Sequence, residues 1–145
     1  FIANGNTSEF GFMTCGRLGY SLNKYRSLYG EVGLSGFGNG IEPAKTKNGL
    51  LTALGAELRL GLNKRSSDQI LLRAAIGYEH LINERRRTIV HAIPGRLAVG
   101  YRHVFGPSVG LDFLVDGGPG IALDEHSNSD FFIGVSGVVG LTVGF

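Results

Sequence analysis

Apolar residues alternate with small or charged residues along most of the chain. From Glu9 to Leu22 the even positions are mainly apolar, whereas the odd positions carry small residues, charges and a few larger side chains. The stretch 49–62 shows the same period, because its even positions from Leu50 to Leu62 are apolar apart from Thr52. Side chains on a β-strand alternate with a period of 2, whereas a helix requires a period of 3.6. Both stretches are therefore predicted to be β-strands.

Seven stretches of this kind follow one another. Their ranges are 9–22, 28–35, 49–62, 69–82, 89–105, 109–123 and 131–145. The sixth keeps its alternation through Gly117–Gly120, and Gly or Pro inside a strand usually marks a bulge or bend. It is therefore predicted to be one long, bent strand. The sequence indicates a single all-β domain, 1–145, built as an antiparallel sheet.

Composition narrows the class of protein. The 145 residues include 24 Gly, 43% are apolar and 18% are charged, which excludes a disordered chain or a collagen repeat. A net charge of +2, from 14 basic and 12 acidic residues, does not indicate nucleic-acid binding. The single cysteine, Cys15, is predicted to be a buried free thiol, because it has no partner for an internal disulfide and no zinc-site spacing. We expect no cofactor and no metal.

The polar face of the predicted strands is unlike the surface of a soluble barrel or sandwich, which should be rich in Lys, Glu, Asn and Gln. Here that face is dominated by Gly, Ala and Ser, with isolated charges that nearly balance. These charges are Glu9, Glu31, Glu57, Glu79, Asp112 and Asp116 against Arg17, Arg59, Arg73, Arg96 and Arg102. Small residues leave room for large charged ones in a narrow interior. We therefore expect a lumen filled by Arg/Glu pairs and an apolar face that points to lipid.

Length supports a membrane assignment. Strands of about 14 residues exceed the roughly 9 to 11 residues that a tilted strand needs to cross a bilayer. The start, Phe1–Asn6, has neither a basic segment nor an apolar run, so the chain is expected to be a mature or truncated form without a signal peptide. The prediction is an antiparallel transmembrane β-barrel.

The carboxyl-terminal segment carries a family resemblance. Gly140-Leu141-Thr142-Val143-Gly144-Phe145 resembles the assembly signal of bacterial outer-membrane barrels, with Gly140, Val143 and Phe145 at its characteristic positions, although Val138 stands where that family usually has a polar residue. Connections that are short after the first, third and fifth stretches and longer at 39–48, 83–88 and 124–130 are typical of the same family. The chain is thus similar to the small OmpA- and OmpX-like barrels. The resemblance implies a Gram-negative outer-membrane location and transient contact with the assembly machinery.

The strand count raises a question, because barrels of this family have an even number of strands and keep both termini in the periplasm. Seven stretches therefore imply a missing strand. Either Phe1–Ser8 is the remnant of a loop whose preceding strand is absent from this chain, or the chain is the C-terminal part of a larger barrel. We expect eight strands in total, with ten or twelve as alternatives.

Three functions are compatible with this fold. The first is a structural, envelope-stabilising or surface-interaction barrel without enzymatic activity. The second is an enzyme resembling the lipid A deacylases, whose motif of His, one residue and Ser-Asn is approached by His126, Ser127 and Ser129; however, His126 and Ser127 are adjacent and would point to opposite faces of a strand. A polar loop tip explains the same residues. The third is the C-terminal part of a larger pore or autotransporter barrel.

Basic residues cluster in two of the longer connections. Lys45 and Lys47 lie in the first, and Arg85, Arg86 and Arg87 in the second. Because the planar Arg side chain binds phosphate as a fork, these residues are candidate contacts for lipopolysaccharide, the alternative being solvated loops.

Histidines and tyrosines mark the expected ends of the apolar face. His80 and His91 share it with Tyr78, and His103 shares it with Tyr101. We expect both groups to lie at the level of the lipid headgroups.

Overall fold

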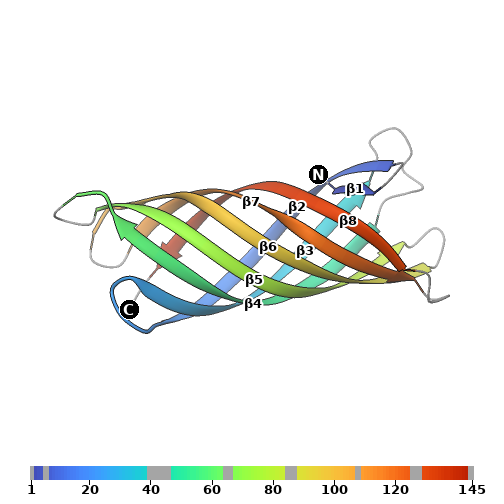
Figure 1. The fold of residues 1–145 in the computed structure, drawn as a ribbon, viewed down its shortest axis with the longest axis horizontal. Helices are drawn as coiled ribbons and strands as arrows, with labels where there is room; N and C mark the ends of the chain where they lie inside the picture. The colour runs from blue at the N-terminus through green and yellow to red at the C-terminus, as the bar shows by residue number, and fades with distance from the viewer. Residues whose placement is uncertain are drawn as a thin grey trace.

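A computed structural model describes residues 2–4, 7–38, 47–63, 67–83, 88–106, 109–124 and 129–143 of the chain. Within these ranges the fold is all-β, and no helix is long and apolar enough to cross a membrane. Seven long strands form one antiparallel sheet and wind diagonally around a common long axis (Figure 1). They are β2 (Thr7–Ser21), β3 (Arg26–Gly38), β4 (Lys47–Gly61), β5 (Asp68–Asn83), β6 (Thr88–Val104), β7 (Val109–Asp124) and β8 (Ser129–Val143), preceded by the short β1 (Ile2–Asn4).

Each long strand pairs with the next one along the chain, as the alternating pattern predicted. The sixth predicted stretch is one strand, because the ladder between β7 and β8 continues from Gly117, opposite Val135, to Gly120, opposite Phe132. The ladder between β6 and β7 has a gap between Pro94 and Leu97, at the level of the same glycines. The bulge or bend predicted for this stretch therefore coincides with a break in the ladder between β6 and β7, whereas the ladder between β7 and β8 is continuous.

The sheet is curled, so that its two faces differ sharply. The face turned toward the axis, called the inner face, buries Tyr29, Leu71 and Leu114, of which Leu71 is 0% exposed. On the opposite, outer face Leu54 is 72% exposed and Leu18 is 86% exposed. The apolar positions of the sequence pattern thus lie outside, and the small and charged ones lie inside.

Inner-face glycines accommodate bulky neighbours. A Cβ atom at Gly55 would lie 2.5 Å from Cζ of Tyr29, which sits opposite it on β3. Likewise, the ring of Phe132 occupies the space that a side chain at Gly120 would need. These close approaches explain why so many positions with inward parity are glycine.

The start of the chain differs from the prediction. Thr7 and Ser8 belong to β2, and Ile2–Asn4 forms β1, so the interpretation of Phe1–Ser8 as a loop remnant is wrong. β1 pairs with β2 from Ile2 opposite Glu9 and with β8 from Ile2 opposite Gly134, and so lies between them. In the described residues no ladder joins β2 directly to β8 beyond β1. We call this stretch, between Gly11–Ser21 and Val135–Val143, the seam.

The predicted contrast between short and long connections is largely wrong. The connections at one end, called the turn end, cover 22–25, 62–67 and 105–108. Those at the other end cover 39–46, 84–87 and 125–128, so only the first of them is clearly longer. The strands extend further than the alternation suggested, because paired backbone continues into polar sequence that carries no hydrophobic signal. Asn23 organises the first turn, as its Oδ1 accepts hydrogen bonds from the backbone N–H groups of Tyr25 and Arg26 at 2.8 and 2.9 Å.

Candidate functional site

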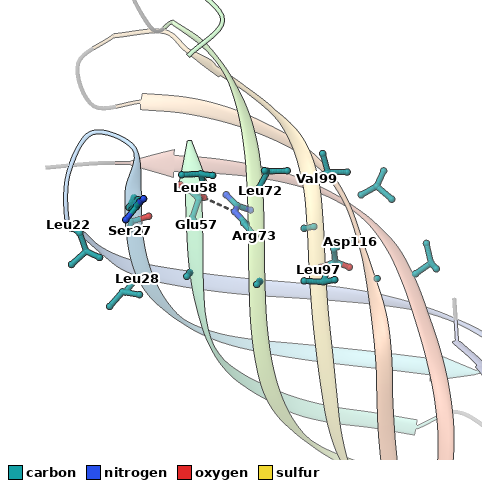
Figure 2. A pocket seen from close by; sticks show the side chains of 17 residues that line it. Leu22, Ser27, Leu28, Glu57, Leu58, Leu72, Arg73, Leu97, Val99 and Asp116 are labelled. Carbon is teal, nitrogen blue, oxygen red and sulfur yellow. Dashed lines mark hydrogen bonds and ion pairs between the residues drawn. The ribbon is translucent and has the colours of Figure 1, made fainter. Parts of the chain in front are cut away.

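Four charged residues meet on the inner face toward the turn end, and we call them the Asp112 cluster. Glu57, Arg73, Arg102 and Asp112 come from four successive strands, β4 to β7. Arg73 donates from Nε to Glu57 at 2.6 Å and from Nη2 to Asp112 at 2.7 Å (Figure 2 shows the first of these ion pairs). Arg102 donates from Nε to Asp112 at 2.6 Å and lies 3.3 Å from Glu57. Each of these four residues is less than 10% exposed, so every charge is both buried and paired.

A second set of four charged residues lies further along the axis, and we call it the Glu31 cluster. Its members are Arg17, Glu31, Arg96 and Asp116. Glu31 receives ion pairs from Arg17 on β2 and from Arg96 on β6. Arg96 also pairs with Asp116, to which Ser136 donates a hydrogen bond. Since β3 and β6 are not neighbours in the sheet, the pair between Glu31 and Arg96 crosses the interior rather than running along a ladder.

Both clusters are electrically neutral, with two carboxylates and two guanidinium groups each. An isolated buried charge is very costly, whereas a paired and hydrogen-bonded one is tolerated. Between the clusters, a cavity lined by residues including Arg17, Tyr29, Arg73 and Leu114 holds about 10 Å³, no more than the space of one water molecule. The interior at this level is filled by side chains. The predicted Arg/Glu pairing inside the sheet agrees with this geometry.

Two predicted inner charges behave differently from the rest. Arg59 lies near the turn end, where its Nε is 3.3 Å from Glu57 and its Nη2 donates to Ser21 at 3.0 Å. Glu79 accepts a hydrogen bond from Ser35, and no ion pair joins it to an arginine among the described side chains. Glu79 is 5% exposed, which agrees with its predicted place on the inner face.

The inner face is less enclosed along the seam. The side chain of Arg17 on β2 is 24% exposed, whereas its partner Glu31 on β3 is 1% exposed. Cys15 is half-buried rather than buried, as are Ser136 and Val138 on β8. Phe132, which lies beside the level of β1, is only 8% exposed. The inner face is thus more enclosed beside β1 than along the seam, where no strand lies between β2 and β8 in the described residues.

His80 and His91 lie close together on the outer face, as their positions in the alternating pattern predicted. His80 and His91 stand opposite one another on β5 and β6, with ring centroids 5.1 Å apart. The hydroxyl of Tyr78 lies 2.6 Å from Nδ1 of His91. These three side chains form a polar group on an otherwise apolar face.

The predicted group of Tyr101 and His103 at the turn end includes a third residue, Asp68, that the sequence did not indicate. Nδ1 of His103 lies 2.8 Å from Oδ1 of Asp68, and the Tyr101 hydroxyl donates to the same carboxylate. Asp68 is the first residue of β5, beside the turn and outside the central part of the strand. Asp68 lies just outside the predicted stretch 69–82, and its contact with His103 follows only from the register, in which the two residues are opposite one another.

The structure gives little information on the residues predicted to act in catalysis, lipopolysaccharide binding or assembly. His126, Ser127, Lys45, Arg85, Arg86, Arg87 and Phe145 lie outside the described residues, so the enzymatic and lipopolysaccharide hypotheses stay predictions. The prediction of a loop at Lys47 is wrong, because Lys47 is the first residue of β4 and pairs with Phe37. The prediction of a loop at Ser129 is also wrong, because Ser129 is the first residue of β8 and pairs with Leu123. Gly140 and Val143 of the predicted assembly signal lie in β8, opposite Asp112 and Val109.

Comparison of the chain with protein-family models, with curated proteins and with solved structures found no match. Among the described residues, no group of three or more His, Cys, Asp or Glu side chains is arranged to hold a metal ion.

Proposed function

We propose that this chain is an integral β-barrel of the bacterial outer membrane with a structural, envelope-stabilising or surface-interaction role. The observation that carries the proposal is the outer face, which exposes large apolar side chains on all seven long strands. Representative positions, one from each strand, are Leu18, Val32, Leu54, Ile76, Leu97, Val115 and Val139, each at least 55% exposed. Soluble monomers rarely leave so extended an apolar surface in water, because its hydration is unfavourable.

The dimensions of the strands support a bilayer crossing. The long strands contain 13 to 17 residues, more than the roughly 9 to 11 that a tilted strand needs. The polar group of Tyr78, His80 and His91 lies toward one end of the outer face, and that of Asp68, Tyr101 and His103 toward the other. Aromatic side chains with polar tips favour the level of the lipid headgroups, so these groups fit the two interfaces.

The proposal requires a further strand in the seam. Unpaired backbone N–H and C=O groups cost several kcal/mol each in hydrocarbon, so a transmembrane sheet has to be closed. The half-exposed inner face along β2 and β8 fits a position that a further strand would cover. With β1 already lying between β2 and β8, a longer strand on the same course would complete an eight-stranded barrel.

The filled interior favours a structural role over conduction. The Asp112 and Glu31 clusters cross the lumen with neutral, mutually paired charges, and the cavity between them has room for about one water molecule. An ion pathway would need hydrated space or charges free to bind a passing ion. A rigid, plugged barrel fits a protein that stabilises the envelope or presents its loops.

Refolding into lipid vesicles, followed by electrophoresis in SDS with and without boiling, tests this proposal. A closed barrel has no free edge and resists SDS at room temperature, so the unboiled protein should migrate at a different position from the boiled one. Identical mobility, together with loss of sheet structure in SDS before heating, would contradict the membrane-barrel assignment.

A further inference from the structure

The outer face carries a groove toward the turn end. It encloses about 900 Å³ and crosses strands β3 to β8. Leu28 on β3, Leu72 on β5 and Leu97 on β6 surround it (Figure 2), and Ala56 and Ala74 stand side by side across β4 and β5. The charged lining residues Glu57, Arg73 and Asp116 make their ion pairs on the inner face, Glu57 with Arg73 and Asp116 with Arg96. The surface that the groove presents outward is therefore apolar.

One cation stands at the β3 end of this groove. Arg26 is exposed, lines the groove and lies opposite Leu58. Among the described residues its side chain has no ion pair or hydrogen bond, unlike the inner-face arginines, which are all paired. The backbone of Arg26 is held by Asn23, and Lys24 lies in the same turn. An exposed, unpaired guanidinium group thus adjoins an apolar groove.

We propose that this groove binds one glycerophospholipid with an anionic headgroup, such as phosphatidylglycerol. Its phosphate pairs with Arg26, and one acyl chain lies in the groove across Ala56 and Ala74. Arg binds phosphate through two parallel hydrogen bonds, and an apolar groove favours a hydrocarbon chain over water. The inference rests on the proposed membrane function and extends it by naming the lipid and the residues that select it.

The dimensions of the groove agree with this occupant. Of the six strands that the groove crosses, β3 to β7 are separated by four spacings of about 4.8 Å, so this part of the groove runs for roughly 19 Å. One leaflet contributes about 15 Å to a hydrocarbon core of about 30 Å. Because Arg26 is the first residue of β3, a phosphate bound there stays at the membrane surface while the chain enters the core.

Fluorescence quenching by brominated lipids tests the site, since the chain contains no Trp and an introduced Trp is the only one present. The reporter is Leu72→Trp, beside the groove, and the matched control is Ile76→Trp, which is on the same face of β5 but does not line the groove. Each variant is refolded into phosphatidylcholine vesicles that contain brominated phosphatidylglycerol. An arginine near an anionic lipid contributes about 1 kcal/mol, so we expect Leu72→Trp to prefer phosphatidylglycerol about fivefold. Ile76→Trp should show no preference.

Three further substitutions separate the headgroup contact from the groove. In the Leu72→Trp background, Arg26→Gln should remove the preference, and Arg26→Lys should retain part of it. Ala74→Leu fills the groove without changing the charge and should also reduce the preference. An equal preference at both reporters, or one that survives Arg26→Gln, would overturn the proposed site. If neither reporter is quenched by any brominated lipid while the protein is folded, the membrane assignment itself fails, and the site with it.

Discussion

The inner and outer faces of the same strands have opposite chemistry. On β4, Glu57 is 7% exposed and pairs with three arginines, whereas Leu54, three residues earlier, is 72% exposed. A protein that folds in water places these residue types the other way round. Period-2 alternation therefore separates the residues onto two faces, and the composition of each face indicates whether that face meets water, lipid or the protein interior.

Removing a carboxylate from the inner face should have the largest effect. Asp112 is 2% exposed and binds both Arg73 and Arg102, so Asp112→Ala leaves two guanidinium groups short of a partner. We expect the free energy of unfolding to fall by about 3–5 kcal/mol in urea titrations of the vesicle-bound protein. The control Asp130→Ala, at an exposed position of β8, should change it by less than about 0.5 kcal/mol. Similar losses in the two variants would remove the distinction between buried and exposed carboxylates.

A charge placed on the outer face should have the next largest effect. Leu54→Arg should disfavour insertion by about 2–4 kcal/mol if the side chain lies at the middle of the bilayer. The adjacent inner-face variant Ala53→Ser should be tolerated, because a hydroxyl beside polar inner-face groups can find a hydrogen-bond partner. The measurement is the fraction folded in vesicles as a function of urea. Equal damage by both substitutions would mean that the faces are wrongly assigned.

Glycines offer a finer comparison of the two faces. Gly55→Val places a side chain against the ring of Tyr29, and overpacking of this kind costs about 1–3 kcal/mol. Gly16→Val on the outer face meets no atom within 4 Å of its Cβ and should be nearly neutral. Thermal unfolding of both variants measures the difference. A larger loss for Gly16→Val would be inconsistent with a packed interior.

The smallest effect is expected at the seam. The side chain of Arg17 is 24% exposed, against 4% for Arg73, so solvent screens its interaction with Glu31. Arg17→Gln should therefore lower the free energy of unfolding by no more than about 1 kcal/mol. Arg73→Gln, measured in parallel, should cost several times as much. Equal values would indicate that β2 is as well enclosed as β5.

The sequence could predict the features that depend on alternation. The strands, the two faces and the balance of inner charges follow from residue parity. Pairs such as Arg17 with Glu31 then follow from the register. The pair between Arg96 and Glu31 could not be predicted, because it depends on how strongly the sheet curls and so brings β6 close to β3.

Other features escaped prediction because their sequence signal is weak. β1 has three residues, too few to show alternation, and the strand ends lie in polar sequence. The hydrogen bond between Ser35 and Glu79 joins residues 44 positions apart, and serine has no distinctive pattern. The candidate groove combines residues from six strands, so it becomes visible only when the strands are placed side by side.

The central claim is that the outer face meets lipid and the inner face does not. Quenching by lipids brominated on their acyl chains tests it most directly, with single Trp residues introduced as Leu54→Trp on the outer face and Tyr29→Trp on the inner face. We expect strong quenching and blue-shifted emission for Leu54→Trp, and little quenching for Tyr29→Trp. Equal quenching at the two positions, or quenching at Tyr29→Trp alone, in protein that retains its sheet structure would contradict the account.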